Sequence, residues 1–578
     1  MATITLNRYY EDELCRLRER AADFGRAHPL LAPMLGAPSG DPDVERLLEG
    51  VAFLTGLARQ KLDDGFPELV QELATLLFPH YLRPVPAATL IAFEPRGALR
   101  EHAVIAAGTE IESTPVDGAR CRFRTCGDLD VEPIALADCR FVAPADGGPA
   151  LRLDFEMLGV DASEWRAARI RLFVAGERLH ASKLFALLAR HVASVELAAG
   201  PPDRPGARHE LGRDALRPAG FDADLLPYPN HAFPGFRLLQ EYFAFAEKFL
   251  FVELTGLERW RAERSGAQFS VWLTLDSVPE WLPGIERDSL RLNVVPALNL
   301  FPHEAVPIQH EHRTADYRLQ PEGDARDQYR IFSVDRVVGC RPGHAVERHY
   351  APFGAGDADA AHYRLVRRPA IDGPGHDVHL ALAYPPGEAL ATETLSIALS
   401  CTNGELPARL KIGDVRHATD SSPERFAFSN IAAVTPPLDP PLGEPLLWRT
   451  LSHLALNFLS LGDVDNLKRM LAIYAFDERR DDARAQADRR RIDGIESVDV
   501  RAETRVVGER MASGQHVTLR CRAGAFGGPG ELYLFGCVLE RFLADYAAIN
   551  TYTRVEIDAS PDGERFVWPA RMGSQCLL

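Results

Sequence analysis

Apolar residues recur at helical spacing near the amino end of the chain. Between residues 44 and 62 they follow one another at intervals of three and four, the period of one helix face. Asp41 and Pro42 are typical of a helix cap and a first helical position. The pattern predicts a helix that begins at Asp41 and buries one stripe, formed by Val44, Leu47, Leu48, Val51, Leu54, Ala58 and Leu62.

Gly50 occupies an interior position of that predicted helix. Glycine inside a helix costs roughly 1 kcal/mol relative to alanine. Close approach of another backbone would offset this cost, and we expect such a contact at Gly50. A tolerated glycine in an ordinary helix is the alternative interpretation.

Three segments share a narrower apolar spacing of 4-3-4-3, which is typical of a coiled-coil seam. They are Tyr10, Leu14, Leu17, Ala21 and Phe24; Leu447, Leu451, Leu454, Phe458 and Leu461; and Phe535, Leu539, Phe542, Tyr546 and Ile549. Each seam needs a facing helix, from the same chain or from a partner. We expect an intermolecular bundle at the first seam. The candidate interface residues are Leu14, Leu17, Phe24, Phe535, Leu539 and Phe542.

Between these helical ends, short β-type runs alternate with glycine, proline and aspartate turns. Strands are predicted at 89–93, 169–174, 195–197, 269–275, 289–295 and 395–399. The fold class is therefore predicted as multidomain α+β. The predicted segments are a helical region at 1–86, two β-rich domains at 87–216 and 217–434, and an α+β domain at 435–578. The last contains a strand pair and a helix from about Leu532 to Ile549.

Composition narrows the class of partner and the compartment. A chain of 578 residues exceeds one usual hydrophobic core, so two to four domains are expected. The net charge of −17 disfavours broad binding of nucleic acid or anionic lipid. Nine scattered cysteines, no signal-peptide pattern and no long apolar run predict a cytoplasmic protein with reduced, structural thiols.

Candidate catalytic and metal motifs are incomplete. His303 and Glu304 begin a zinc-protease pattern, but Pro307 holds the position of the second ligand. The pairs His310/His312 and His376/His379 lack a third ligand and are interpreted as solvated loops. The glycines at 524, 527, 528 and 530 lack the lysine of a phosphate loop and are interpreted as a flexible loop. We therefore expect no cofactor, no metal and no enzymatic activity.

Two charged or aromatic stretches also have simple structural interpretations. Arginines and acids alternate over Arg479–Arg491, which indicates a solvated face. The aromatic block Phe233–Phe251 is interpreted as a domain core with its charges at the edge.

Several strings in order along the chain resemble the TssF (ImpG/VasA) family of type VI secretion baseplate subunits. The resemblance begins at Tyr9 and Tyr10 and continues with Asp41, Pro42, Glu45, Arg46, Leu47, Leu48, Glu49 and Gly50. Later strings lie at 62–69, 78–84, 233–243 with 247–249, 299–301, 401–407, 448–461 and 534–550. Ala246 stands where the family is expected to have proline.

The resemblance implies a structural role in a baseplate wedge. The implied partners are TssG, TssE, the adaptor TssK, the VgrG spike hub and a second copy of the chain. It also implies a cytoplasmic location at the inner face of the cell envelope, mechanical coupling to sheath contraction, and no cofactor. Two alternatives remain: a wedge protein of a contractile phage tail or injection particle, and a cytoplasmic carbohydrate-active enzyme or binding module. The second requires a pocket with paired carboxylates or stacking aromatics.

Overall fold

A computed structural model describes most of the chain. The described residues are 10–11, 13–21, 26, 42–143, 148–221, 223–228, 233–323, 328–341, 347–354, 360–370, 375–385, 391–442, 462–475, 483–507, 510–547, 551–561 and 563–573. The chain forms two compact units. One comprises Met1–Phe78 and Pro441–Leu451, and the other Pro79–Pro440 and Ser452–Leu578.

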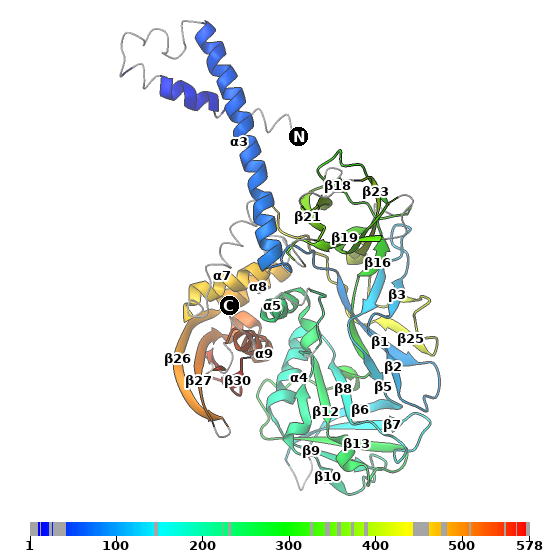
Figure 1. Cartoon of the computed structure of the whole chain (residues 1–578). Helices are drawn as coiled ribbons and strands as arrows, with labels where there is room; N and C mark the ends of the chain where they lie inside the picture. Colours follow the sequence, from blue (N-terminus) through cyan, green and yellow to red (C-terminus); the bar gives the residue numbers. More distant parts are fainter. Residues whose placement is uncertain are drawn as a thin grey trace. The chain divides into compact units, whose positions relative to one another are not determined.

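The first unit contains the helix α3 (Pro42–Leu77), which is 36 residues long (Figure 1). It begins at Pro42, and the acids Asp43 and Glu45 in its first turn complement the positive end of the helix dipole. This confirms the predicted start, although Asp41 lies outside the described residues. Residues 13–21 form a second helical stretch, which an ion pair between Arg18 and Glu45 joins to α3.

The second unit starts with an extended segment, as the prolines predict: Val85 pairs with Leu438 in an isolated bridge. A six-stranded antiparallel sheet follows, in the order β24 (Val415–Ala418), β3 (Glu110–Ser113), β4 (Arg122–Thr125), β15 (Val294–Leu298), β1 (Ala88–Pro95) and β25 (Phe426–Asn430). The core beside it includes Ile91, Phe93, Phe123 and Phe428, together with Leu129 and Val131. Leu129 and Val131 belong to β5 (Leu129–Val131), which pairs with β2 (Ala103–Ile105) in a small two-stranded sheet.

Two further sheets lie in the middle of the chain. One has the order β10 (Arg208–Glu210), β9 (Val192–Ala199), β13 (Gln268–Leu275), β7 (Ala150–Met157) and β6 (Ile134–Val142). The other has the order β11 (Leu216–Pro218), β12 (Phe251–Thr255), β8 (Arg169–Val174) and β14 (Leu290–Arg291). Helix α4 (Arg178–Arg190) follows β8 and buries most of its apolar side chains, although Leu179 is exposed.

A separate β-rich region has its own core around Val337, Leu380 and Ile397. Its sheet contains β16 (Phe301–Glu304), β23 (Glu393–Thr402), β19 (Arg330–Cys340), β20 (Glu347–Pro352), β21 (His362–Pro369), β22 (His376–Ala383) and β18 (Tyr317–Arg318), with β17 (Ile308–His310) beside β23.

The carboxyl-terminal region is mixed, as predicted. Its helices are α7 (Val464–Ala475), α8 (Ala483–Asp493) and α9 (Pro529–Asp545). Its sheet contains the long hairpin of β26 (Ile495–Val507) and β27 (Arg510–Arg522), then β28 (Thr551–Ser560), β29 (Arg565–Val567) and β30 (Arg571–Met572) (Figure 1). Strand β28 runs parallel to β27, with α9 as the connection between them.

The predicted fold class of multidomain α+β is confirmed. Most predicted strands are present, but the run Ser289–Val295 is divided between β14 and β15, with Asn293 between them at a φ of 57°. Three sheets combine strands from both sides of residue 216, so strand pairing does not separate the chain there. The division into four segments stays a prediction.

Helix α9 is the centre of packing in this unit, and nearly all of its side chains are buried. It contacts α4, β28 and helix α5 (Pro234–Phe245). At Gly530, an added Cβ would lie 2.5 Å from the backbone nitrogen of Lys183 in α4. The interpretation of the glycines at 524–530 as a flexible loop is therefore wrong at Gly530, which permits close helix packing.

A buried ionic cluster joins α4, α8 and α9. Arg178 donates from Nε to both carboxylate oxygens of Glu531, at 3.0 and 3.2 Å. Arg491 contacts Glu531 at 3.2 Å and Asp488 at 2.5 Å. Glu531, Asp488 and Arg491 are all buried, so the prediction of a solvated face for the arginine-rich stretch is wrong at these positions. Burial raises the pKa of Asp488, while the attraction of Arg491 opposes that shift.

The aromatic block on α5 and the turn after it forms a core, as interpreted. Phe236, Tyr242 and Phe243 are buried there. Its charges are not all at an edge, however, because Glu241 and Lys248 form an ion pair with both side chains buried. The carboxylate also accepts the backbone amides of Leu225 and Leu226, so it anchors the segment before α5.

We predict that Glu531→Gln strongly destabilises the second unit. The substitution leaves the buried Arg491 and the partly buried Arg178 without the charge that balances them, and breaking a buried pair costs about 3–5 kcal/mol. The thermal unfolding midpoint should fall clearly. The control is Asp117→Asn, which removes an exposed pair with Arg409 and changes stability by about 0–1 kcal/mol. Equal midpoints for the two variants would contradict this assignment.

A pH-dependent prediction concerns Asp545 at the carboxyl end of α9. Burial raises the pKa of its carboxyl from 3.8 to about 6, helped by Glu540 and opposed by Arg571. Because the folded state holds the proton more tightly, this contribution to stability is complete below pH 3.8 and is lost as the pH rises through 6. Asp545→Asn should therefore stabilise the chain by about 1–2 kcal/mol at pH 7 and above.

Thermal midpoints between pH 5 and pH 8 test the assignment of Asp545. The advantage of the Asn variant should grow as the pH rises and level off above about pH 7. A constant difference across that range would rule out titration of Asp545 as its cause.

Candidate interaction surface

Helix α3 carries apolar side chains that the single chain leaves exposed. Leu47 is 69% exposed and Leu54 is 66% exposed, and the neighbouring apolar residues Val51, Phe53 and Leu57 are exposed as well. At 100° per residue, these positions share one broad face of the helix. The prediction that the stripe through Leu47, Val51 and Leu54 is buried is therefore wrong for the isolated chain.

The opposite side of α3 is the buried one. Ala52 and Gly56 are buried, four residues apart on one face of the helix. Small residues at this spacing permit another segment to approach closely, and Glu45 on nearly the same side binds Arg18 of residues 13–21. The prediction assigned the wrong face of α3 as buried, because leucines identify an apolar face but do not show whether other residues cover it.

Gly50 lies within the exposed apolar face. An added Cβ there would meet nothing within 4 Å. Among the described residues, no other backbone makes the expected close approach to Gly50. A glycine among exposed leucines leaves room for a partner backbone at that position.

The remaining predicted interface residues have different environments. Leu14 is buried and Leu17 partly buried in the first unit, while Phe24 and the seam at 447–461 lie outside the described residues. Phe535, Leu539 and Phe542 are buried in the second unit. Phe542 lies 6.0 Å from Phe236 between ring centroids, so this seam packs within the chain.

The candidate histidines are structural rather than solvated. His310 is buried and its Nδ1 lies 2.9 Å from the Tyr317 hydroxyl, so the loop interpretation is wrong there. His376 is also buried, between Arg367 at 2.6 Å and Asp439 at 3.1 Å. Burial lowers the pKa of His376, despite the opposing hydrogen bond to Asp439. In the part of the chain that the structure describes, no cluster of three or more His, Cys, Asp or Glu side chains is arranged to hold a metal.

One described cavity is lined by several acids but does not resemble a sugar-hydrolysing site. Its volume is about 60 Å³, and the acids include Asp130, Glu132 and Glu253. Each of these carboxylates already binds a cation or a donor: Arg169 for Asp130, Trp165 for Glu132, and Arg217 for Glu253. The volume corresponds to about two water molecules, too small for a sugar ring.

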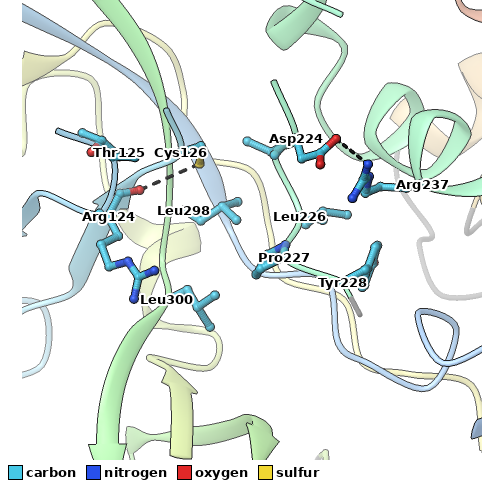
Figure 2. Close-up of a pocket in the computed structure, with 13 residues that line it drawn as sticks. Arg124, Thr125, Cys126, Asp224, Leu226, Pro227, Tyr228, Arg237, Leu298 and Leu300 are labelled. Atoms are coloured by element: carbon cyan, nitrogen blue, oxygen red, sulfur yellow. Dashed lines mark hydrogen bonds and ion pairs between the residues drawn. The ribbon is translucent and has the colours of Figure 1, made fainter. Parts of the chain in front are cut away.

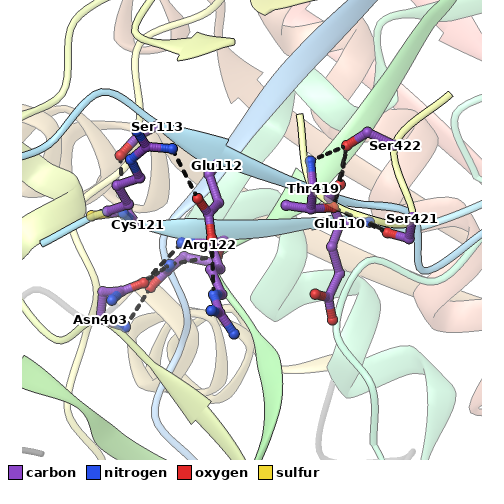
Figure 3. Close-up of polar contacts among 11 residues, drawn as sticks. Glu110, Glu112, Ser113, Cys121, Arg122, Asn403, Thr419, Ser421 and Ser422 are labelled. Atoms are coloured by element: carbon purple, nitrogen blue, oxygen red, sulfur yellow. Dashed lines mark hydrogen bonds and ion pairs between the residues drawn. The ribbon is translucent and has the colours of Figure 1, made fainter. Parts of the chain in front are cut away.

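One polar feature was missed from sequence. Asn299 and Asn403, from strings quoted above only for their resemblance, bind each other: Asn299 Nδ2 donates to Asn403 Oδ1 at 2.7 Å, and Asn403 N donates to Asn299 Oδ1 at 2.7 Å. Asn403 also accepts the amide of Arg122 in β4 (Figure 3). The only signal in the sequence is asparagine at the end of two apolar strands, which does not reveal the pairing.

An exposed apolar helix face on a chain with a large, well-packed body is typical of a subunit of a protein assembly. None of the described helices is long and apolar enough to cross a membrane. Comparison with known proteins agrees with that class. The family model "Type VI secretion system, TssF" matches residues 2–575, and the chain therefore belongs to the TssF family of type VI secretion baseplate components.

Relatives extend over nearly the full length. The chain is 29% identical to "Type VI secretion system component TssF1" of Pseudomonas aeruginosa, over 98% of each chain. It is similar to a chain in a cryo-electron microscopy structure of the type VI secretion TssK-TssF-TssG baseplate subcomplex, with 31% identity, a TM-score of 0.78, and coverage of 92% of this chain and 99% of that one. A structure of the type VI baseplate complex matches with 28% identity, a TM-score of 0.60, and coverage of 99% and 100%.

We predict opposite effects for alanine at two helical glycines. Gly50→Ala should raise the stability of α3 by about 0.5–1 kcal/mol, because the site has room and alanine favours a helix. Gly530→Ala should lower the thermal midpoint, because its Cβ would lie 2.5 Å from the Lys183 backbone. Amide hydrogen exchange of α3 measures the first effect. Faster exchange in Gly50→Ala would show that something in the isolated chain occupies the space beside Gly50.

Proposed function

We propose that this chain is a structural wedge subunit of a type VI secretion baseplate and that the exposed face of α3 is its docking surface for a partner helix. The observation that carries the proposal is the exposure of Leu47, Val51 and Leu54 around Gly50. Leucine side chains around a glycine can receive a second helix at short distance, since packing then involves apolar contact without a bulky residue at the centre.

The partner we propose for this surface is TssG, which occurs together with a TssF chain in the similar solved structure. Leu17, which is partly buried in the first unit, is proposed to extend the same docking surface, whereas Leu14 is already buried there and Phe24 lies outside the described residues. Phe535, Leu539 and Phe542 are not carried into the proposal, because the chain's own core contains them.

The wider assembly is also a proposal. TssK, TssE, the VgrG hub and a second copy of this chain are the further partners, and the assembled subunit is placed at the inner face of the cell envelope. The role is mechanical and not enzymatic: contacts that differ between the extended and contracted states transmit the signal for sheath contraction. The rigid, ion-paired body around α9 suits a subunit that transmits force.

We predict that the double variant Leu47→Ser/Leu54→Ser weakens assembly without unfolding the chain. Both residues are exposed, so folding should change little, while a bound partner would lose two apolar contacts worth about 1.5–3 kcal/mol each. The full-length chain should be co-expressed with a TssG-like protein from the same organism. Native mass spectrometry then gives the stoichiometry.

The matched control for the leucine variants is Ile412→Ser, since Ile412 is 64% exposed and lies in the second unit. We expect a stable complex for the wild type and for Ile412→Ser, and a largely dissociated one for the double leucine variant. Equal complex formation by all three proteins would eliminate α3 as the docking surface. A wild-type chain that binds no partner would count against the wedge function itself.

A further inference from the structure

A cavity lies between the end of β4 and the segment that leads into α5 (Figure 2). Its volume is about 320 Å³. Thr125 and Cys126 form one wall with Leu298 and Leu300, and residues 224–228 form the facing wall. Both walls belong to the second unit, so the cavity is a feature of one compact body.

The wall at residues 224–228 is held in place from behind. Glu241 Oε1 accepts the backbone amides of Leu225 at 2.8 Å and Leu226 at 2.9 Å. Tyr228 donates from its hydroxyl to Gln240 Oε1 at 2.7 Å. Since α5 fixes these groups before any ligand arrives, the cavity is preorganised, and binding there orders little of the chain.

The cavity has one positive charge in excess. Arg237 forms an ion pair with Asp224 at 2.5 Å, so these two lining charges cancel. Arg124 also lines the cavity, and within the described residues its guanidinium makes no hydrogen bond or ion pair. Glu110 is opposite Arg124 in the β3–β4 ladder, but no ion pair joins them.

Arg122, the neighbouring arginine on β4, differs from Arg124 because its charge is balanced within the chain. Arg122 is two residues earlier, on the same side of the strand as Arg124. It donates from Nε to Glu112 Oε1 at 3.2 Å (Figure 3) and its guanidinium lies 5.7 Å from the centre of the Phe301 ring. Arg122 is therefore occupied within the chain, whereas Arg124 is available.

The chemistry of the lining selects a class of ligand. A guanidinium binds a carboxylate through two parallel hydrogen bonds, and a single net positive charge matches one carboxylate better than a phosphate dianion. Leu226, Pro227, Leu298 and Leu300 supply apolar surface for the carbon atoms next to that carboxylate. The volume is at the lower end of about 300–1,000 Å³ for ligand pockets and suits one or two amino-acid side chains.

We propose that this cavity is a docking site for an acidic side chain on a loop of a partner protein, and that Arg124 binds its carboxylate. The site is separate from the α3 surface and provides the body of the subunit with a contact of its own. The choice of a baseplate protein as the partner rests on the proposed function.

The test compares full-length wild-type chain, Arg124→Gln and the matched control Arg122→Gln. Affinities for purified TssG-like and TssK-like proteins from the same organism are measured at low and moderate salt. Arg124→Gln should weaken binding to one of them by about 10- to 100-fold, mainly through faster dissociation, because a desolvated charge pair is lost. Arg122→Gln should stay within about threefold of the wild type, since its charge is already matched in the chain.

Each other outcome overturns the proposal in a recognisable way. Unchanged affinity of Arg124→Gln, with wild-type assembly intact, removes the docking site and leaves the wedge function standing. Equal losses in both variants indicate a general charge effect and overturn the role of Arg124. A wild-type chain that binds neither partner removes the wedge function and this proposal together. Tight, saturable binding of inorganic phosphate to the free chain, abolished by Arg124→Gln, replaces the partner loop with a free anion.

Discussion

The body of this protein depends on the buried carboxylate of Glu531. It lies in the first turn of α9, where Arg178 from α4 and Arg491 from α8 both bind it. A buried carboxylate is stable only when cations and donors surround it, so the three helices are constrained to one arrangement. Gly530, directly before it, lets α9 approach the α4 backbone closely enough for the ion pairs to form. The packing of α9 against α5 and β28 then follows from its fixed position.

In the first unit, by contrast, the large apolar side chains of one helix face are exposed. Helix α3 leaves leucines exposed and buries the small residues Ala52 and Gly56 on its other side. An apolar surface that remains exposed in a folded chain is stabilised by association, and Gly50 provides space for a neighbouring backbone. The protein thus combines a body fixed by internal ion pairs with a helix whose apolar face is exposed. Both properties suit a subunit of the TssF family in a baseplate.

Local sequence patterns predicted the helices and strands well, but they predicted poorly which side chains are buried and what they contact. The start of α3 at Pro42, the strands at 89–93 and 269–275, and the last helix all follow from period and turn residues that act within a few positions. The burial of the charges did not follow from local patterns. Asp488 and Arg491 look like any solvated pair in the sequence, because Glu531, which binds Arg491, is about 40 residues away. The cavity at Arg124 was missed for the same reason: its walls come from segments about 100 residues apart in sequence. The exposed face of α3 could be recognised as apolar, but its exposure depends on which residues the rest of the chain covers.

The most direct test of the account is amide hydrogen exchange of residues 47–57, measured in the isolated full-length chain and in its complex with the TssG-like partner. If α3 docks a partner helix through Leu47, Gly50 and Leu54, exchange in this stretch slows markedly in the complex, while exchange of α9 is already slow and stays unchanged. A stable complex in which residues 47–57 exchange as fast as in the free chain would contradict the account.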